Sequence, residues 1–405
     1  MTPSLSPVRF LHRKSPPHAV TLVLLIALSA LTMNLFLPSL PHMATYFGAD
    51  YSVMQLAVSL YLLASAIVQL VIGPISDRYG RRMILLWAVA LYVLATLGAM
   101  LAQEVHVFLL FRMLQSVVAA TMVLSRAIVR DMYDTDEAAS VMGYVTMGMA
   151  IVPMLGPTVG GFLDQAFGWQ ASFGFMLACG LGILSLTWAD LGETTSTRPT
   201  SLRAQFEEYP QLLTSRRFWG YCLTSAFASG VFFAYLGGAP YIGSVFFHLP
   251  PSVLGLYFGA PALGYAVGNF ISGRYSRRFG VNRMVIMGTA CTVLGLGTLT
   301  AFYLFGLVHP AIFFGFFTTV GLGNGLVLPN ASAGMLSVRP KLAGTASGLG
   351  GTIMIGGGAA LSALAGAVLT PDSGPLPLLV VMIASSIASV FSILWVIVRE
   401  RQLTD

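Results

Sequence analysis

The residues most able to do chemistry in this sequence are polar side chains inside long apolar segments. Arg112 lies within such a segment, and Gln115 follows it about one helical turn later. A charge inside a membrane costs about 2.5–3.5 kcal/mol on insertion scales, so Arg112 should face the interior of a helix bundle. Two interpretations are open. Arg112 is either a structural arginine bonded to backbone carbonyls of the first span, or a fixed positive charge that tunes proton binding or attracts an anionic or dipolar molecule.

A second group of charges follows the second apolar segment, in the stretch Gly73-x-x-x-Asp77-Arg78-x-Gly80-Arg81-Arg82. Its glycines permit a tight turn and a close approach of helices. A carboxylate at a membrane boundary should need a cationic partner or a helix N-terminus. We expect this pairing to latch two halves of the molecule in one state, whereas the alternative is that the arginines merely orient the helices. The predicted gate comprises Gly73, Asp77, Arg78, Gly80, Arg81, Arg82, Arg126, Arg130 and Asp131.

The elements that position these residues are predicted to be membrane-spanning helices. Of the 405 residues, 56% are hydrophobic and only 9% are charged, whereas soluble domains carry about 25% charged residues. A span needs about 20 apolar residues. Twelve segments have that length: 20–40, 53–73, 84–103, 107–128, 139–163, 171–190, 218–240, 252–272, 284–306, 310–330, 343–369 and 376–398.

The placement of charges and cysteines argues against a nucleic-acid-binding protein and against a metal site. The net charge of +6 comes from short basic clusters between apolar runs, which indicates membrane-flanking charges rather than nucleic-acid binding. The three cysteines lie inside apolar runs without metal-ligand spacing, so we expect buried packing residues and no metal. The segment 20–40 exceeds the length of a signal-peptide core, so we expect it to be retained as the first span.

The chain divides into two halves. The longest polar connection, 191–217, separates six spans in 1–190 from six in 218–405. With both termini in the cytoplasm, the predicted cytoplasmic segments and span ends hold 20 of the 21 Lys and Arg residues, and Arg112 is the remaining one. Four residues of the first half recur 200 positions later, as Gly273, Ser276, Arg278 and Gly280. Repeated halves with a site between them are a common plan of transporters.

The motifs resemble those of a known family. The glycine- and arginine-rich loop resembles the signature of the major facilitator superfamily, Arg112-Met-Leu-Gln115 resembles a motif of its 12-span drug–proton antiporter branch, and Gly156-Pro157-Thr-Val-Gly160-Gly161 resembles the antiporter motif. Phe36-Leu-Pro38-Ser-Leu-Pro41 and Arg126-Ala-Ile-Val-Arg130-Asp131 look closest to the bicyclomycin and chloramphenicol resistance family. The resemblance implies an all-α membrane protein with two pseudo-symmetric six-helix bundles. It also implies that the span with the antiporter motif packs against the eighth span.

One position departs from this family. Many of its members carry an acidic residue in the first span, and this chain has Asn34 there. An amide does not titrate near neutral pH, so Asn34 cannot carry a proton. A coupling proton would have to bind at a membrane-boundary carboxylate such as Asp131 or Asp164, or move with substrate and water past Arg112. We expect weak coupling, with Asn34 hydrogen-bonded to the substrate.

The resemblance implies a non-enzymatic exporter of small amphiphilic antibiotics, such as phenicols, by alternating access and proton antiport in a bacterial inner membrane. We expect a monomer that takes no cofactor and binds no nucleic acid. The alternative is a carrier for one physiological metabolite, weakly coupled or uncoupled to protons. Aromatic and Met side chains suit varied apolar ligands. The predicted substrate contacts are Asn34, Tyr61, Arg112, Gln115, Met147, Phe233 and Tyr257.

Overall fold

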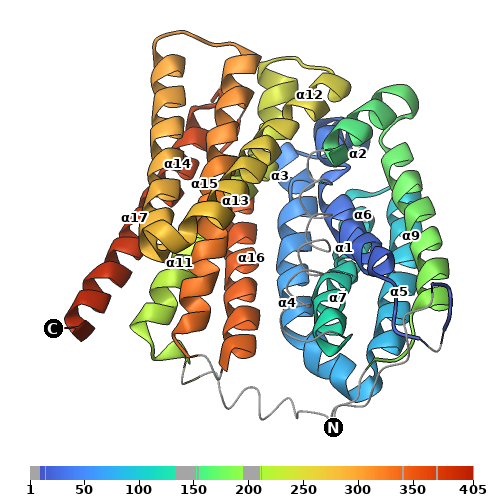
Figure 1. Ribbon diagram of the computed structural model, residues 1–405. Coiled ribbons are helices and arrows are strands. Elements are labelled where there is room, and N and C mark those ends of the chain that lie inside the picture. The colour runs from blue at the N-terminus through green and yellow to red at the C-terminus, as the bar shows by residue number, and fades with distance from the viewer. Residues whose placement is uncertain are drawn as a thin grey trace.

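The computed structural model describes residues 10–13, 15–132, 152, 155–194, 210, 212–339, 342–370 and 373–404. Over these residues the regular structure is helical (Figure 1), as the sequence predicts. Eleven stretches of the described residues are long and apolar enough to cross a membrane. Eleven of the twelve expected spans begin within several residues of these helices. The fifth expected span, 139–163, lies mostly outside the described residues, which include a helical segment at 155–167.

The helices of the first half pack beside one another (Figure 1). They are α1 (Ala19–Asn34), α2 (Leu40–Phe47), α3 (Tyr51–Met54), α4 (Leu56–Tyr79), α5 (Arg81–Leu101), α6 (Val105–Gln115), α7 (Ala119–Met132) and α9 (Gln170–Asp190). Short 3₁₀ turns, Leu37–Ser39 and Ser116–Val118, connect α1 to α2 and α6 to α7, so each of these pairs forms one long span.

The helices of the second half form the other group (Figure 1). They are α11 (Arg216–Tyr241), α12 (Pro251–Tyr257), α13 (Gly259–Phe279), α14 (Val281–Leu304), α15 (Pro310–Ser337), α16 (Ala343–Ala367) and α17 (Leu376–Thr404). A π-helical turn, Ile242–Phe246, extends α11.

Glycines set the same turn in both halves. Gly80 separates α4 from α5 with φ of +91°, and Gly280 separates α13 from α14 with φ of +81°. L side chains rarely adopt this conformation, so only glycine makes such a turn without strain. The two positions are 200 residues apart, and the tight turn predicted from the repeat is therefore present in each half.

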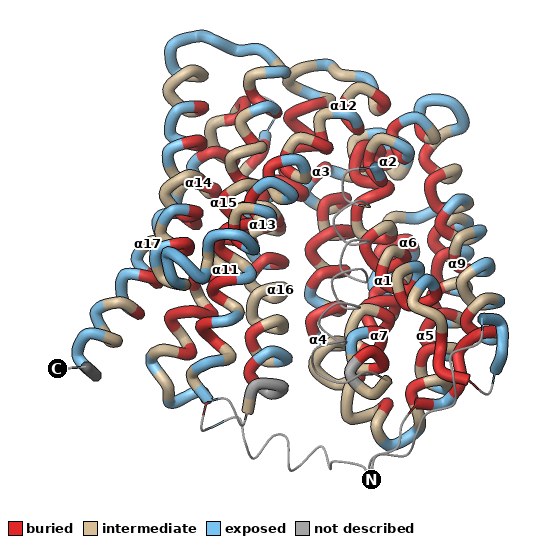
Figure 2. The backbone as a smooth tube through the Cα atoms, in the orientation of Figure 1, coloured by how far each residue is buried: buried red, intermediate tan, exposed pale blue. Residues whose placement is uncertain are grey.

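Side-chain burial follows the expectation for helices in lipid. Large apolar side chains on the outer faces are exposed, with Phe270 at 72%, Leu294 at 69% and Phe391 at 68%. Polar side chains such as Arg112, Gln115 and Thr96 are buried. Figure 2 shows buried, intermediate and exposed residues alternating along the helices. A soluble bundle has the opposite pattern, because its outer face must be polar.

The two ends of the bundle differ. We call the end at which α1 begins and α17 ends the terminal face, and the other end the distal face (Figure 1). The halves meet near the distal face, where Tyr51 Oη donates to the Gly237 carbonyl at 2.8 Å and Gln55 Nε2 donates to Ser362 Oγ at 2.8 Å. Toward the terminal face, a Cβ built on Gly73, Gly348 or Gly351 would meet no described atom within 4 Å.

Candidate functional site

Arg112 is the centre of a polar cluster that joins four helices of the first half. Its side chain is 1% exposed. Nη2 donates to the Thr32 carbonyl of α1 at 2.8 Å, and Nε donates to the Ala57 carbonyl of α4 at 3.2 Å. Nη1 donates to Gln115 Oε1 at 2.8 Å, and Gln115 Nε2 donates to Thr96 Oγ1 of α5 at 2.8 Å. The Arg-x-x-Gln spacing therefore places both side chains in one network.

Two aromatic rings complete the surroundings of this charge. The guanidinium carbon lies 4.2 Å from the ring centroids of both Phe36 and Tyr61. A cation over an aromatic face is attracted by the ring quadrupole, most strongly when both are desolvated. Because no carboxylate among the described residues pairs with Arg112, the backbone carbonyls and the rings supply the stabilisation that a buried charge requires.

The predicted substrate contacts do not form a single group. Tyr61, Arg112 and Gln115 lie together in this cluster. Asn34 is 3% exposed and donates from Nδ2 to the Ala30 carbonyl of its own helix at 2.7 Å. Phe233 and Tyr257 lie in the second half, in α11 and α12.

Two of the other predicted contacts pack within the second half. Phe233 of α11 is 9% exposed, and its ring occupies the space in which a Cβ on Gly358 of α16 would lie. The ring of Tyr257 stacks on Phe314 of α15 at 5.0 Å between centroids. Met147 lies outside the described residues.

The predicted gate forms a chain of charges on the terminal face of the first half. Arg81 is 3% exposed and pairs with Asp77 at 3.1 Å and with Asp131 of α7. The Glu193 carboxylate accepts from the backbone N–H of Arg81 at 2.9 Å and of Arg82 at 3.3 Å, which caps the N-terminus of α5. In this conformation the described partner of Asp77 thus belongs to its own half, whereas the sequence pattern led us to expect a latch between halves.

The other gate residues lie apart from this chain. Arg126 of α7 is exposed, and Tyr265 of α13 in the other half lies near it. Arg78 lies over the ring of its neighbour Tyr79 at 5.4 Å. The side chain of Arg130 is outside the described part of the chain.

The antiporter-motif segment packs backbone to backbone. A Cβ on Gly160 would lie closer than 3.0 Å to the Leu35 carbonyl of the first span, and one on Gly161 would lie equally close to the Pro251 carbonyl of α12. A Cβ on Gly255 would meet the Pro157 carbonyl in the same way. Only glycine permits this approach.

Thr158 adds a hydrogen bond to the same contact, from Oγ1 to the Gly255 carbonyl at 3.1 Å. Gly156, by contrast, has only ordinary contacts, the nearest being Asn34 Cβ at 3.6 Å. We call the contact between 157–161 and α12 the distal seam. It joins the fifth and eighth spans, as the resemblance implied.

Sequence reasoning missed a second contact between the halves at the distal face. Tyr51 lies against Tyr241 with ring centroids 4.7 Å apart, in addition to its bond to Gly237. Gln55 is fully buried and bonded to Ser362. Gln55 is a polar residue at the start of an apolar segment, so its position was a usable signal.

His42 and Asp164 form a pair that the sequence did not connect. His42 Nδ1 lies 2.8 Å from Asp164 Oδ1, and the Asp164 side chain is fully buried while that of His42 is 52% exposed. Among the described residues, no Asp or Glu lies in the middle of a span.

Comparison with known proteins agrees with this architecture. The family model of the Major Facilitator Superfamily matches residues 22–363 and 240–404. A chloramphenicol resistance protein of Pseudomonas aeruginosa is 32% identical over 81% of this chain and 79% of its own length. Multidrug resistance protein D of Escherichia coli strain K12 is 28% identical over 89% of this chain and 91% of its own.

Among solved structures, a D-xylose–proton symporter aligns with a TM-score of 0.73 at 15% identity, over 93% of this chain and 96% of that one. At this identity the likeness shows the fold alone. The family match, the relatives that match over most of their length and the glycine-built seam together lead to one assignment: the chain is a multi-pass membrane transporter that belongs to the Major Facilitator Superfamily, in its drug-efflux branch.

Proposed function

We propose that this protein exports small amphiphilic antibiotics, phenicol-like compounds among them, across a bacterial inner membrane by alternating access. The observation that carries the proposal is the distal seam, in which a glycine-rich helix closes one end of the interface backbone to backbone. The named relatives in the efflux branch supply the substrate class.

The basic residues indicate which end of the protein faces the cytoplasm. The clusters around Arg81, Arg217 and Arg278 flank the ends of spans, and positive residues favour the cytoplasmic side. We therefore infer that the terminal face and both termini are cytoplasmic. The distal seam is closed, whereas a Cβ built on Gly73, Gly348 or Gly351, toward the terminal face, would meet no described atom within 4 Å. With this orientation, we infer that the protein is in a state closed to the outside of the cell.

We expect the protein to act as a monomer. Its expression should lower chloramphenicol accumulation several-fold in a bacterium that lacks its own efflux pumps. The measurement is uptake of labelled chloramphenicol, with cells carrying the empty vector as the control. Collapse of the pH gradient should restore accumulation if export is a proton antiport. Unchanged accumulation of several unrelated amphiphilic drugs would contradict the proposal.

A second candidate is a carrier for one physiological metabolite. The observation that favours it is the absence of a carboxylate in the middle of the described spans, which leaves proton antiport without its usual group. Exchange of a single metabolite with no effect on any drug would support this carrier over the exporter.

We expect Asn34→Asp to make transport depend more strongly on pH than in the wild type. The substitution introduces a titratable group at a buried position of the first span, 3% exposed, while the wild-type amide stays neutral. Desolvation would favour its neutral form, and Arg112 in the same bundle would favour the charged form. Transport by both proteins in proteoliposomes, with and without a pH gradient, tests this. Strong gradient dependence in the wild type would exclude weak coupling, and identical responses would exclude position 34 from coupling.

A further inference from the structure

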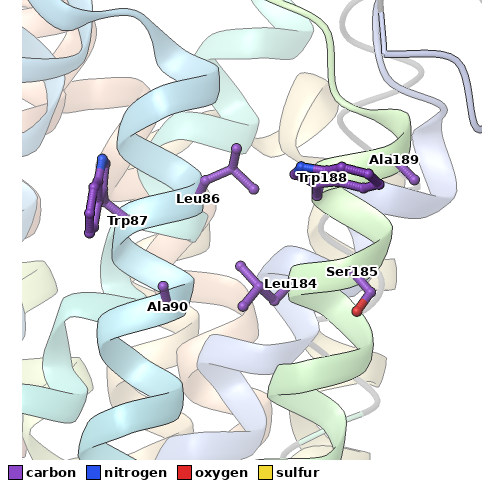
Figure 3. Close-up of a pocket in the computed structure, with 7 residues that line it drawn as sticks. All are labelled: Leu86, Trp87, Ala90, Leu184, Ser185, Trp188 and Ala189. Carbon is purple, nitrogen blue, oxygen red and sulfur yellow. The ribbon is translucent and has the colours of Figure 1, made fainter.

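A groove runs along the outer surface of the first half, between α5 and α9 near the terminal face. Its volume is about 820 Å³. Leu86 of α5 and Leu184 and Trp188 of α9 point toward one another across the space between the two helices (Figure 3). Trp87 is 67% exposed and Trp188 is 51% exposed. The other lining residues are Ala90, Ser185 and Ala189. The groove is therefore open, predominantly apolar and flanked by two exposed indoles.

The groove has the depth of one lipid leaflet. Its lining begins within the first two turns of α5 and reaches Ala90, nine residues after Arg81. At 1.5 Å per residue, Ala90 lies about 13 Å along the helix from the terminal face. Half of a hydrocarbon core is about 15 Å. Tryptophans at such a position are typical of the membrane–water interface. An acyl chain entering from the terminal face would therefore lie at its natural depth.

Two arginines lie at the terminal end of this groove, on the same tryptophan. The guanidinium carbon of Arg13 lies 3.4 Å from the Trp188 ring centroid. Arg82 Nη2 donates to the Trp188 carbonyl at 2.9 Å. The two guanidinium groups are near enough to repel each other.

One nitrogen of the Arg82 guanidinium lacks a hydrogen-bond acceptor in the described part of the chain. Its Nη1 is buried and has no hydrogen-bond partner among the described residues. The nearby Glu193 carboxylate attracts the Arg82 guanidinium, and it accepts hydrogen bonds from the backbone N–H groups of Arg81, Arg82 and Thr194. A buried donor without an acceptor is costly, so an anion bridging the two arginines would remove both the repulsion and the unmet bond.

We propose that this groove binds an anionic phospholipid, with an acyl chain between α5 and α9 and the phosphate between Arg13 and Arg82. The apolar lining fits a hydrocarbon chain, and the paired cations fit a headgroup that carries a net negative charge. Only the identity of the leaflet, the cytoplasmic one, rests on the orientation proposed above.

Such a lipid would connect three parts of the first half. Arg13 belongs to the N-terminal segment, whose Leu11 N–H bonds to Asp190 at the end of α9 and whose Ser15 carbonyl accepts from Gly192 N–H at 3.1 Å. Arg82 belongs to the gate loop. The headgroup would thus hold the N-terminal segment against the gate and the end of α9.

The test is native mass spectrometry of the purified full-length protein with equimolar phosphatidylglycerol and phosphatidylcholine of the same chain length. We expect phosphatidylglycerol to bind preferentially. Arg13→Gln should lower that preference about fivefold, because one basic residue at a charged surface is worth about 1 kcal/mol. Arg399→Gln is the matched control, since Arg399 lies one turn after the exposed Trp395 at the terminal end of α17. It should leave the preference unchanged.

Two further experiments test whether the acyl chain occupies the groove and whether a phosphate compound without an acyl chain can replace the lipid. Ala90→Trp should reduce binding of the lipid by filling the groove, and glycerol phosphate, which has no acyl chain, should fail to displace phosphatidylglycerol. Equal binding of the two lipids, equal effects of Arg13→Gln and Arg399→Gln, or displacement by glycerol phosphate would each overturn the proposal. If Ala90→Trp does not fold, the Arg13→Gln variant still tests the proposal, because Arg13 is exposed and its substitution should not disturb the packing of buried side chains. None of these readouts depends on transport, so they stand apart from the test of export.

Discussion

Arg112→Ala is expected to reduce drug export to below about a tenth of the wild-type rate and to destabilise the first half of the protein. The substitution removes the hydrogen bonds that the Arg112 guanidinium donates to the Thr32 and Ala57 carbonyls and to Gln115 Oε1, and a hydrogen bond to a charged group contributes about 1.5–3 kcal/mol. It also removes the cation between Phe36 and Tyr61. The measurements are export in proteoliposomes and the Tm of the detergent-solubilised protein.

Two variants separate charge from geometry at this position. Arg112→Lys should retain part of the export, because it keeps a positive charge but loses the planar fork that reaches two carbonyls and Gln115 at once. Tyr61→Phe should keep most of the activity, since it preserves the ring beneath the guanidinium. Export by Arg112→Ala at the wild-type rate would show that the charge has no part in transport.

Gly161→Ala is expected to open the distal seam and to lower export by about tenfold or more. A Cβ at this position would overlap the Pro251 carbonyl of α12, and backbone atoms on both sides cannot give way locally. Each 1.4 kcal/mol of steric cost shifts the ratio of closed to open molecules about tenfold, so an overlap whose cost exceeds the few kcal/mol by which a two-state protein favours one state makes the open state the more populated one. Gly255→Ala should act the same way from the other half, through the Pro157 carbonyl.

The seam prediction has a control within the same motif. Gly156→Ala should leave the conformation unchanged, because its Cβ would have only ordinary contacts with Asn34 and Leu35. Spin labels at Tyr46 and Leu307, both exposed near the distal face, would report the separation of the halves once the three native cysteines are replaced by serine. A longer distance in Gly161→Ala but not in Gly156→Ala is the expected result. Equal distances in both would contradict a closing role for the seam.

The spans could be predicted from the sequence because each depends on local composition. A helix in lipid must satisfy its own backbone and present apolar side chains over about 20 residues, so the run of residues determines it without reference to the rest of the chain. The turns at Gly80 and Gly280 were predictable for a similar reason, since a positive φ selects glycine locally.

The candidate site was predictable only in part. The Arg112–Gln115 pair is separated by three residues on one helix, so their contact follows from helical spacing. The partners Thr32 and Ala57 are backbone carbonyls on other helices, and a carbonyl has the same chemistry at every position. Phe233 and Tyr257 have the residue types of a binding surface, yet they pack on Gly358 and Phe314, because aromatic side chains serve a core equally well.

By itself, the sequence determined the class of protein, the number and order of the spans, the repeat and the motifs, since each of these depends on residues close together along the chain. Only the tertiary structure decided which end of the interface is closed, that Asp77 pairs within its own half, and that Tyr51 and Gln55 join the halves. These contacts link residues up to 307 positions apart. In a protein that alternates between conformations such contacts change while the sequence stays the same, so the packing of the two halves, and not the order of residues, decides them.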